Sequence, residues 1–499
     1  MSNLSELLPS GGGQNLVEFV ASGTLPNGKP VILKTNGQVE AVAETSTSVT
    51  ESIPLGSEVL FNSGATNGVQ VAFDPNTAGK FVIVYTDYGN SGAGTAIIGT
   101  VSGSTLSFGS EAVFNSSECA ELSVSFDPNT AGKFVVTYQN KGNSSYGTAI
   151  VGTVSGTSIS YGSEYVFESA EAANTSTSFD PNTANKIVIA YQDGGNGNKG
   201  TAIVGTVSGT SISFGSASVF STSSTSYISI SFDPNTANKF IVGGRATSAY
   251  AGVYVGTISG TSLSFGSQQN ASTVESNYVL MQYDPNTAGK FVVTYENRDN
   301  SEYGTAVVGT VSGTSCSFGS TVVFNSGATA YLSLSFDANT ANKIVISYKD
   351  SGNSNYGTAI VGTVSGTSIS FGSESVFNSA SSLYTSVSFD PSSAGKFVVA
   401  YRDSGASGGG AVTGQIASVV VTTNLTATNL IGITSEATSS GGTAKINTWG
   451  GINEAQTSLT IASDYYAQTN GTITTASASP AQKLGTAISA TTINMKDLT

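Results

Sequence analysis

The acidic residues are the only abundant side chains in this sequence that could carry acid–base chemistry. The chain has 499 residues, with 32 Asp and Glu residues and no histidine. A Ser-His-Asp triad, a Cys-His pair and a His-ligated zinc site are therefore impossible. Hydrolysis of a glycosidic bond needs only two carboxylates and stays open on residue type alone. The acidic residues must be assigned set by set.

The first acidic set lies in copies of one segment, Phe-Asp-Pro-Asn-Thr-Ala-Gly-Lys and its close variants. An Asp at the first position of such a turn accepts hydrogen bonds from nearby backbone N–H groups, and the following Pro fixes φ. A catalytic centre needs one special position, whereas these copies are equivalent. We therefore assign a structural, turn-capping role to Asp74, Asp127, Asp180, Asp233, Asp284, Asp337 and Asp390.

The second acidic set lies in polar loops rich in Gly, Asn and Ser. It comprises Asp87, Asp193, Glu296, Asp299, Asp350 and Asp403. The segment from Asp350 to Asn355 alternates oxygen-bearing side chains, as a calcium loop does. The bidentate Glu expected at its twelfth position is replaced by Val361. We expect solvated turns here, with no metal and no cofactor.

The repeated Asp also reveals the elements that position these loops. Successive copies lie 53, 53, 53, 51, 53 and 53 residues apart. One unit contains four short runs rich in Val, Ile, Phe and Thr, separated by turn residues: 335–336, 344–348, 358–364 and 369–377. A period near 50 residues without a helical pattern is typical of radially repeated β architecture. The predicted fold is all-β, a seven-bladed β-propeller of four-stranded antiparallel blades.

The ends of the array predict how the ring closes. The seventh unit has no fourth-strand sequence after Ile416, but residues 55–61 match residues 318–324 of another unit. We expect residues 55–61 to supply the outer strand of the last blade, which leaves no unmatched edge. The predicted domains are an N-terminal β anchoring module (1–51), the propeller (52–418) and a C-terminal β module (419–499).

Composition narrows the function classes. Only 10% of residues are charged and the formal net charge is −14, so the clustered basic residues that bind nucleic acid are missing. The sequence has no apolar run of membrane-spanning length and no signal peptide, so we expect no membrane insertion. Cys119 and Cys316 lie in distant units, so we expect two free thiols.

The two ends of the predicted blades differ in sequence. The turns between first and second strands, and between third and fourth strands, are nearly the same in every copy, whereas the other connections vary. Tyr residues gather in these variable connections, where their flat rings and hydroxyls favour recognition of a carbohydrate or protein. The alternative is that these loops vary because nothing constrains them. The candidate recognition residues are Tyr88, Tyr146, Tyr227, Tyr250, Tyr278, Tyr303, Tyr331, Tyr356 and Tyr384.

The flanking segments carry a family resemblance. Leu459, Tyr465-Tyr466 and Gly471-Thr472, followed by Gly485 and Ala487-Ile488-Ser489, resemble terminal modules of tailed-bacteriophage structural and fibre proteins. Residues 21–33 with Asn36-Gly37-Gln38-Val39 are similar to N-terminal modules of marine phage virion proteins. The resemblance implies an appendage on the virion, attached to the tail or capsid. Its implied partners are other virion structural proteins and further copies of this chain, joined through the terminal modules.

These observations favour a non-enzymatic phage virion protein that displays a propeller face for attachment to a host-surface glycan or protein. One alternative is a secreted bacterial propeller, either lectin-like or glycan-cleaving, and another is a purely architectural spacer. Sialidase-type propellers carry Trp-containing turns and an Arg cluster. Here the one Trp, Trp449, lies outside the ring, and the ring holds only Arg245, Arg298 and Arg402. That enzyme class is therefore disfavoured.

Overall fold

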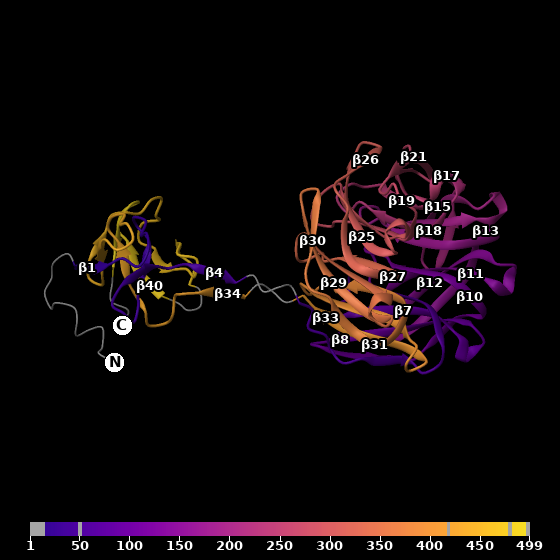
Figure 1. The fold of residues 1–499 in the computed structure, drawn as a ribbon, viewed down its shortest axis with the longest axis horizontal. Helices are drawn as coiled ribbons and strands as arrows, with labels where there is room; N and C mark the ends of the chain where they lie inside the picture. The colour runs from indigo at the N-terminus through magenta and orange to yellow at the C-terminus, as the bar shows by residue number, and fades with distance from the viewer. Residues whose placement is uncertain (1–14, 48–51, 417–419, 478–481, 496–499) are drawn as a thin grey trace. The chain divides into compact units, whose positions relative to one another are not determined.

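The computed structural model describes residues 15–47, 52–416, 420–477 and 482–495 (Figure 1). These residues form β-strands joined by turns, and their only helical segments are three-residue 3-10 turns. No helix in the described ranges is long and apolar enough to cross a membrane. The chain divides into two compact units, one of Met1–Val49 with Val419–Thr499 and one of Thr50–Ser418.

The first unit combines both ends of the chain, which corrects the prediction of separate N- and C-terminal modules. One sheet has the order β1-β36-β35-β2-β3, so strands from the two ends alternate. Neither end could satisfy its strand edges alone, because β1 and one edge of β2 pair with strands some 400 residues away. The strands are β1 (Leu16–Val20), β2 (Pro30–Leu33), β3 (Val39–Ala41), β35 (Leu430–Thr434) and β36 (Thr443–Asn447).

The remaining strands of this unit form two smaller sheets. A two-stranded ribbon pairs β4 with β34, and a five-stranded sheet has the order β37-β41-β40-β38-β39. Their bounds are β4 (Glu44–Thr47), β34 (Val420–Thr423), β37 (Ile452–Asn453), β38 (Asp464–Ala467), β39 (Ile473–Thr474), β40 (Gln482–Ala487) and β41 (Ile493–Asn494).

The second unit contains seven copies of one antiparallel strand arrangement, and each copy is called a repeat below. The second strands are β7 (Lys80–Asp87), β11 (Lys133–Asn140), β14 (Lys186–Asp193), β19 (Lys239–Arg245), β24 (Lys290–Asn297), β28 (Lys343–Asp350) and β32 (Lys396–Asp403). The third strands are β8 (Ala93–Ser102), β12 (Tyr146–Ser155), β15 (Lys199–Ser208), β20 (Ala251–Ser259), β25 (Tyr303–Ser312), β29 (Tyr356–Ser365) and β33 (Gly408–Gln415). Each second strand lies between a first and a third strand.

The first strands of all seven repeats line one cavity. They are β6 (Thr66–Phe73), β18 (Ser226–Phe232), β23 (Ser276–Tyr283) and the later parts of β10 (Ala112–Phe126), β13 (Ser158–Phe179), β27 (Val322–Phe336) and β31 (Ser375–Phe389). In β10, for example, the early residues pair with β8 and the later residues pair with β11 of the next repeat. The fourth-to-first connections of four repeats are therefore continuous strands, where the sequence predicted loops.

In five repeats the fourth strand begins with a separate short piece, which corrects the predicted unbroken strand there. In the second repeat it is continuous within β13 (Ser158–Phe179), as predicted. The early pieces are β9 (Thr105–Phe108), β16 (Ser211–Phe214), β21 (Ser262–Phe265), β26 (Ser315–Phe318) and β30 (Ser368–Phe371), and separate later pieces are β17 (Ser218–Ser224) and β22 (Gln269–Asn270). A glycine follows several early pieces. A Cβ on Gly319 would lie 1.9 Å from the carbonyl oxygen of Thr367, so neighbouring repeats pack closely at this point. Gly162 approaches Thr210 in the same way inside unbroken β13.

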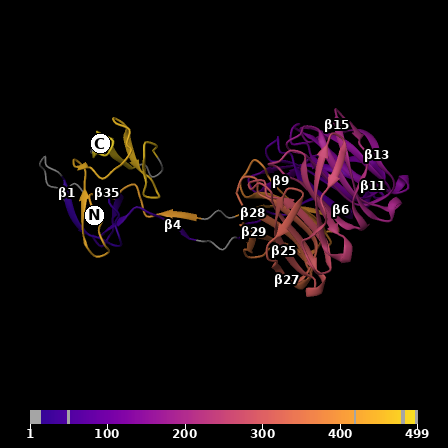
Figure 2. The same ribbon diagram turned by 90° about the horizontal axis from the view of Figure 1, so that it is seen from above.

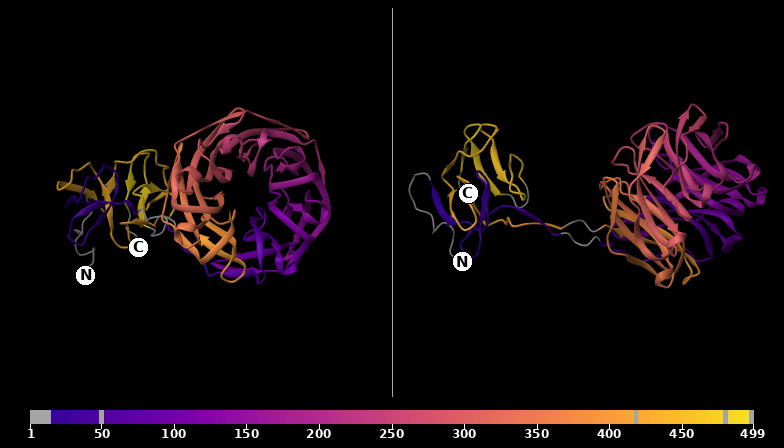
Figure 3. Two further views of the ribbon diagram at one scale, coloured as in Figure 1. Left: turned by 45° about the vertical axis from the view of Figure 1, so that its right-hand side comes forward. Right: turned by 45° about the horizontal axis from the view of Figure 1, so that its top comes forward.

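The last repeat contacts the first. Strand β5 (Val59–Asn62) pairs with β33, with Leu60 opposite Gly410, as the repeat comparison predicted. The Ser386 hydroxyl in β31 accepts a hydrogen bond of 3.0 Å from the backbone N–H of Val71 in β6. Figure 3 shows the repeats of this unit following one another around a ring, and Figure 2 gives the same strands from above.

The core of the second unit lies between neighbouring repeats. One cluster, for example, joins Val84 and Ile98 of the first repeat to Phe134 and Tyr138 of the second. These side chains are almost completely buried. The second and third strands bury side chains on both faces, which gives each repeat two packing surfaces.

Candidate functional site

The seven repeated aspartates act as turn caps. In every copy, Oδ1 accepts a hydrogen bond of 2.8–2.9 Å from the backbone N–H two residues later. Three copies also link repeats, as where Asp337 Oδ2 accepts from the N–H of Gly395 at 2.7 Å. All seven side chains are buried, with at most 2% exposure. The structural assignment of this set is confirmed.

Three residues of the second acidic set also bind local backbone. Asp87, Asp350 and Asp403 each accept a hydrogen bond from an N–H two or three residues later. Glu296 is buried and accepts a hydrogen bond of 3.1 Å from Asn277. In the described part of the chain, no group of three or more His, Cys, Asp and Glu residues is placed to hold a metal ion.

Both cysteines are buried free thiols, as predicted. Burial raises the pKa of each thiol, Cys119 and Cys316, to about 12. A thiol with such a pKa carries almost no thiolate near neutral pH, and the thiolate is the nucleophile. Neither cysteine is a candidate reactive group.

The candidate site begins at a β-bulge that every repeat shares. Six residues before each repeated Asp, the first strand breaks register with the second strand. The residue in the bulge has a left-handed backbone, with φ between 48° and 57° in all seven copies. We call these seven residues the bulge ring: Gly68, Glu121, Asn174, Tyr227, Tyr278, Tyr331 and Tyr384.

Four members of the bulge ring bring their aromatic rings together. Ring centroids lie 5.1 Å apart for Tyr227 and Tyr278, 5.4 Å for Tyr278 and Tyr331, and 4.9 Å for Tyr331 and Tyr384. The rings are tilted by 46–58° and half-buried. We call this group the tyrosine arc. Each tyrosine comes from a different consecutive repeat, so the arc is a surface that no single repeat forms.

The polar members of the bulge ring continue the same chain of contacts. Glu121 Oε2 accepts a hydrogen bond of 3.0 Å from the backbone N–H of Asn174. Asn174 Oδ1 in turn accepts one of 2.8 Å from the N–H of Tyr227, at the start of the arc. Aromatic surface and hydrogen-bonding groups are therefore placed next to each other around one ring.

Cationic side chains approach the tyrosine arc at two places. Lys349 Nζ lies 6.0 Å from the ring centroid of Tyr331, within the range of a cation–π interaction. Arg402 Nη1 donates to Asn67 at 2.5 Å, while its Nε is buried without a partner in the described structure. Burial raises the pKa of the Tyr278 and Tyr384 hydroxyls, so both stay protonated and able to donate.

The other five predicted tyrosines do not join the arc. Tyr146, Tyr303 and Tyr356 begin third strands, Tyr250 directly precedes β20, and Tyr88 opens a 3-10 turn with 46% of its surface exposed. None of the ring contacts in the described structure involves them. The sequence prediction missed the three other members of the bulge ring, Gly68, Glu121 and Asn174. Their signal was the constant offset of six residues from each Asp.

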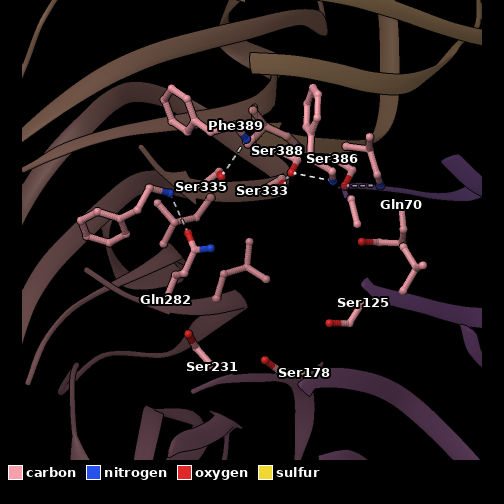
Figure 4. A pocket seen from close by; sticks show the side chains of 18 of the residues that line it. Gln70, Ser125, Ser178, Ser231, Gln282, Ser333, Ser335, Ser386, Ser388 and Phe389 are labelled. Atoms are coloured by element: carbon pink, nitrogen blue, oxygen red, sulfur yellow. Dashed lines mark hydrogen bonds between the residues drawn. The ribbon is translucent and has the colours of Figure 1, made fainter. Parts of the chain in front are cut away.

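A separate cavity of about 430 Å³ lies among the first strands (Figure 4). Its lining repeats one pattern, with hydroxyl or amide side chains at Ser125, Ser178, Ser231, Gln282 and Ser335. Several of these groups bind the backbone of the next repeat, as where Phe389 N–H donates to Ser335 Oγ at 3.2 Å. The tyrosine arc does not line this cavity. The lining groups hold neighbouring repeats together.

Comparison with known proteins gives limited similarity. No protein-family model matches the chain, and no curated protein matches it. Among solved structures, the chain is similar to a protein of unknown function from Dyadobacter fermentans, with 11% sequence identity and a TM-score of 0.45. The match covers 73% of this chain and 99% of that protein.

Proposed function

We propose that residues 52–418 form a seven-bladed β-propeller, and that its tyrosine arc is a non-enzymatic recognition surface. Seven equivalent repeats support the architecture, together with the pairing of β5 with β33. The hydrogen bonds from Val71 and Phe73 of the first repeat to Ser386 and Ser388 of the last also support it. Such pairing leaves the array without a free edge.

The observation that carries the recognition proposal is the left-handed backbone of the four arc tyrosines. A non-glycine residue in this region costs about 1–2 kcal/mol. Gly68 occupies the equivalent position of the first repeat without that cost. Four consecutive repeats thus keep a large aromatic residue where glycine fits better, and strained backbone of this kind gathers at functional sites.

The chemistry of the arc favours a ligand with flat apolar faces and polar edges. The tyrosine rings offer apolar area, and their hydroxyls donate hydrogen bonds. Glu121 and Asn174 add acceptor oxygens beside the rings, and Lys349 adds a donor. A sugar ring has this combination of faces and edges. We infer that the ligand is a surface glycan, with no bond broken on binding.

The unit formed by both chain ends is the proposed anchor. Its sequence carries the resemblance to tailed-bacteriophage virion proteins, so we propose that it attaches the propeller to other virion proteins and to further copies of this chain. The propeller would then present its arc to the host surface. Detection of the chain by mass spectrometry in purified virions supports this placement, and its absence from them contradicts it.

The recognition proposal is tested by comparing two double variants of the full chain on a glycan array. Tyr278→Gly with Tyr331→Gly removes the centre of the arc, whereas Tyr303→Gly with Tyr356→Gly removes two tyrosines outside it. Each lost ring is expected to weaken binding of the best glycan by roughly tenfold. The outer variant should bind as the unchanged chain does. Equal binding by all three proteins would refute the arc as the recognition surface.

A further inference from the structure

The fourth repeat lacks an aromatic side chain that every other repeat has. In the later piece of the fourth strand, six repeats carry a Phe, and the fourth has Ala271 at the equivalent position. Each of the six rings lies 4.9–5.4 Å from a tyrosine ring. In five repeats a second aromatic ring lies 5.7–6.2 Å away. The six are Phe61, Phe114, Phe167, Phe220, Phe324 and Phe377.

A cavity of about 260 Å³ lies where the missing ring would be. Ala271 lines it on one side, and Tyr295 and Phe318 of the fifth repeat line it on the other. These are the same two kinds of ring that contact the phenylalanine elsewhere, as where Phe324 lies 5.4 Å from Tyr348 and 5.7 Å from Phe371. An apolar cavity of about 150 Å³ already accommodates benzene. The space is sufficient for a substituted aromatic ring.

The same cavity also lacks a carboxylate that other repeats have. The hydroxyls of Tyr85, Tyr348 and Tyr401 each donate a hydrogen bond of 2.8 Å to a glutamate. In the fifth repeat the equivalent of that glutamate is Thr321, which also lines the cavity. The Tyr295 hydroxyl has no hydrogen bond to any described residue. Burial raises its pKa to about 12, so it remains a donor at neutral pH.

We propose that this cavity, named here the repeat-4 cavity, binds a small aromatic carboxylate. The ring of the ligand lies against Tyr295 and Phe318, and its carboxylate accepts a hydrogen bond from the Tyr295 hydroxyl. The other repeats provide the precedent, because the chain itself places a phenyl ring and a carboxylate around the same tyrosine. No charged side chain lines the cavity to repel the ligand. This site is separate from the tyrosine arc and does not rest on the proposed function.

The first test titrates phenylacetate into the full chain by calorimetry, with acetate and toluene as comparison ligands. Phenylacetate should bind at one site per chain and more tightly than either comparison ligand. Ala271→Phe should abolish the binding and raise the melting temperature, because the added ring fills the cavity with a contact that six repeats already make. Binding that survives Ala271→Phe, or no saturable binding by the unchanged chain, would overturn the proposal.

Two further variants separate the roles of the ring and the carboxylate. Tyr295→Phe removes the donor, so phenylacetate should bind roughly tenfold more weakly while toluene binding is unchanged. Thr321→Glu restores the chain's own acceptor, and it should remove the preference for phenylacetate over toluene. If neither variant changes the ratio of the phenylacetate and toluene affinities, the proposed hydrogen bond from Tyr295 to the ligand is refuted. Correct folding of both variants is checked by their melting temperatures.

Discussion

Replacement of Tyr331 by Gly and by Ala tests the strained backbone of the tyrosine arc. Both variants lose the ring contacts with Tyr278 at 5.4 Å and Tyr384 at 4.9 Å. At about 0.5–1.5 kcal/mol for each aromatic pair, that shared loss is about 1–3 kcal/mol. The variants differ only in backbone preference. Ala keeps the cost of about 1–2 kcal/mol for a left-handed backbone. Gly avoids that cost, but its freer unfolded chain lowers the free energy of unfolding by about 0.4–1 kcal/mol.

Taking the middle of both ranges, Tyr331→Gly should be more stable than Tyr331→Ala by about 0.8 kcal/mol, the reverse of the usual order inside a strand. The assay is urea denaturation of both variants beside the unchanged chain, with the midpoints compared at equal slopes. Both variants should lose glycan binding to the same extent. If Ala is as stable as Gly or more stable, position 331 is not left-handed and the argument from strain fails.

Three other predictions concern the scaffold. Asp337→Asn should lower the free energy of unfolding by about 1.5–3 kcal/mol more than Asp284→Asn. The reason is that Asp337 Oδ2 accepts a hydrogen bond from Gly395 N–H, while Asp284 Oδ2 has no partner in the described structure. Equal losses in urea denaturation would contradict this. Deletion of residues 52–62 removes β5 and leaves one edge of β33 unpaired, so the melting temperature should fall well below that of the full chain. An unchanged melting temperature would show that this pairing does not stabilise the unit. Cys119 and Cys316 should react with a thiol reagent at pH 8 only after denaturant is added, since burial raises both pKa values to about 12, and rapid labelling of the folded chain would refute their burial.

The repeat made much of the second unit predictable. Seven copies fix the turn role of Asp337 and its equivalents, and the match of residues 55–61 to residues 318–324 predicts the pairing of β5 with β33. The break in the fourth strand could not be predicted. The Gly-Ser sequence at Gly319 also occurs at Gly162 inside unbroken β13, so the local sequence does not signal the break.

The first unit has no internal repeat from which its strand pairing could be predicted. Each chain end has hairpin signals of its own, which favoured two separate modules. The pairing of β1 with β36 joins Leu16 to Asn447, and nothing in either short strand specifies a partner at that distance. A single sequence without repeats carries little information about which distant edges pair.

The candidate site could be predicted only in part. Variable connections rich in tyrosine indicated the end of the repeats at which the arc lies, but the arc depends on a bulge that tyrosine does not signal. The bulge could have been inferred from Gly68 and Asn174, because these residue types favour a left-handed backbone and share the offset of Tyr331 from the next Asp. The five other candidate residues are also tyrosines in variable connections, but they do not occupy the bulge position.

The most direct test of the central claim is a crystal structure of the full chain with the glycan that binds best on the array. The account predicts a sugar ring in contact, at about 4 Å, with the rings of Tyr278 and Tyr331. Polar edges of that sugar should meet Lys349 or the hydroxyls of neighbouring tyrosines. A glycan bound in full occupancy elsewhere on the chain, with the tyrosine arc empty, would contradict the account.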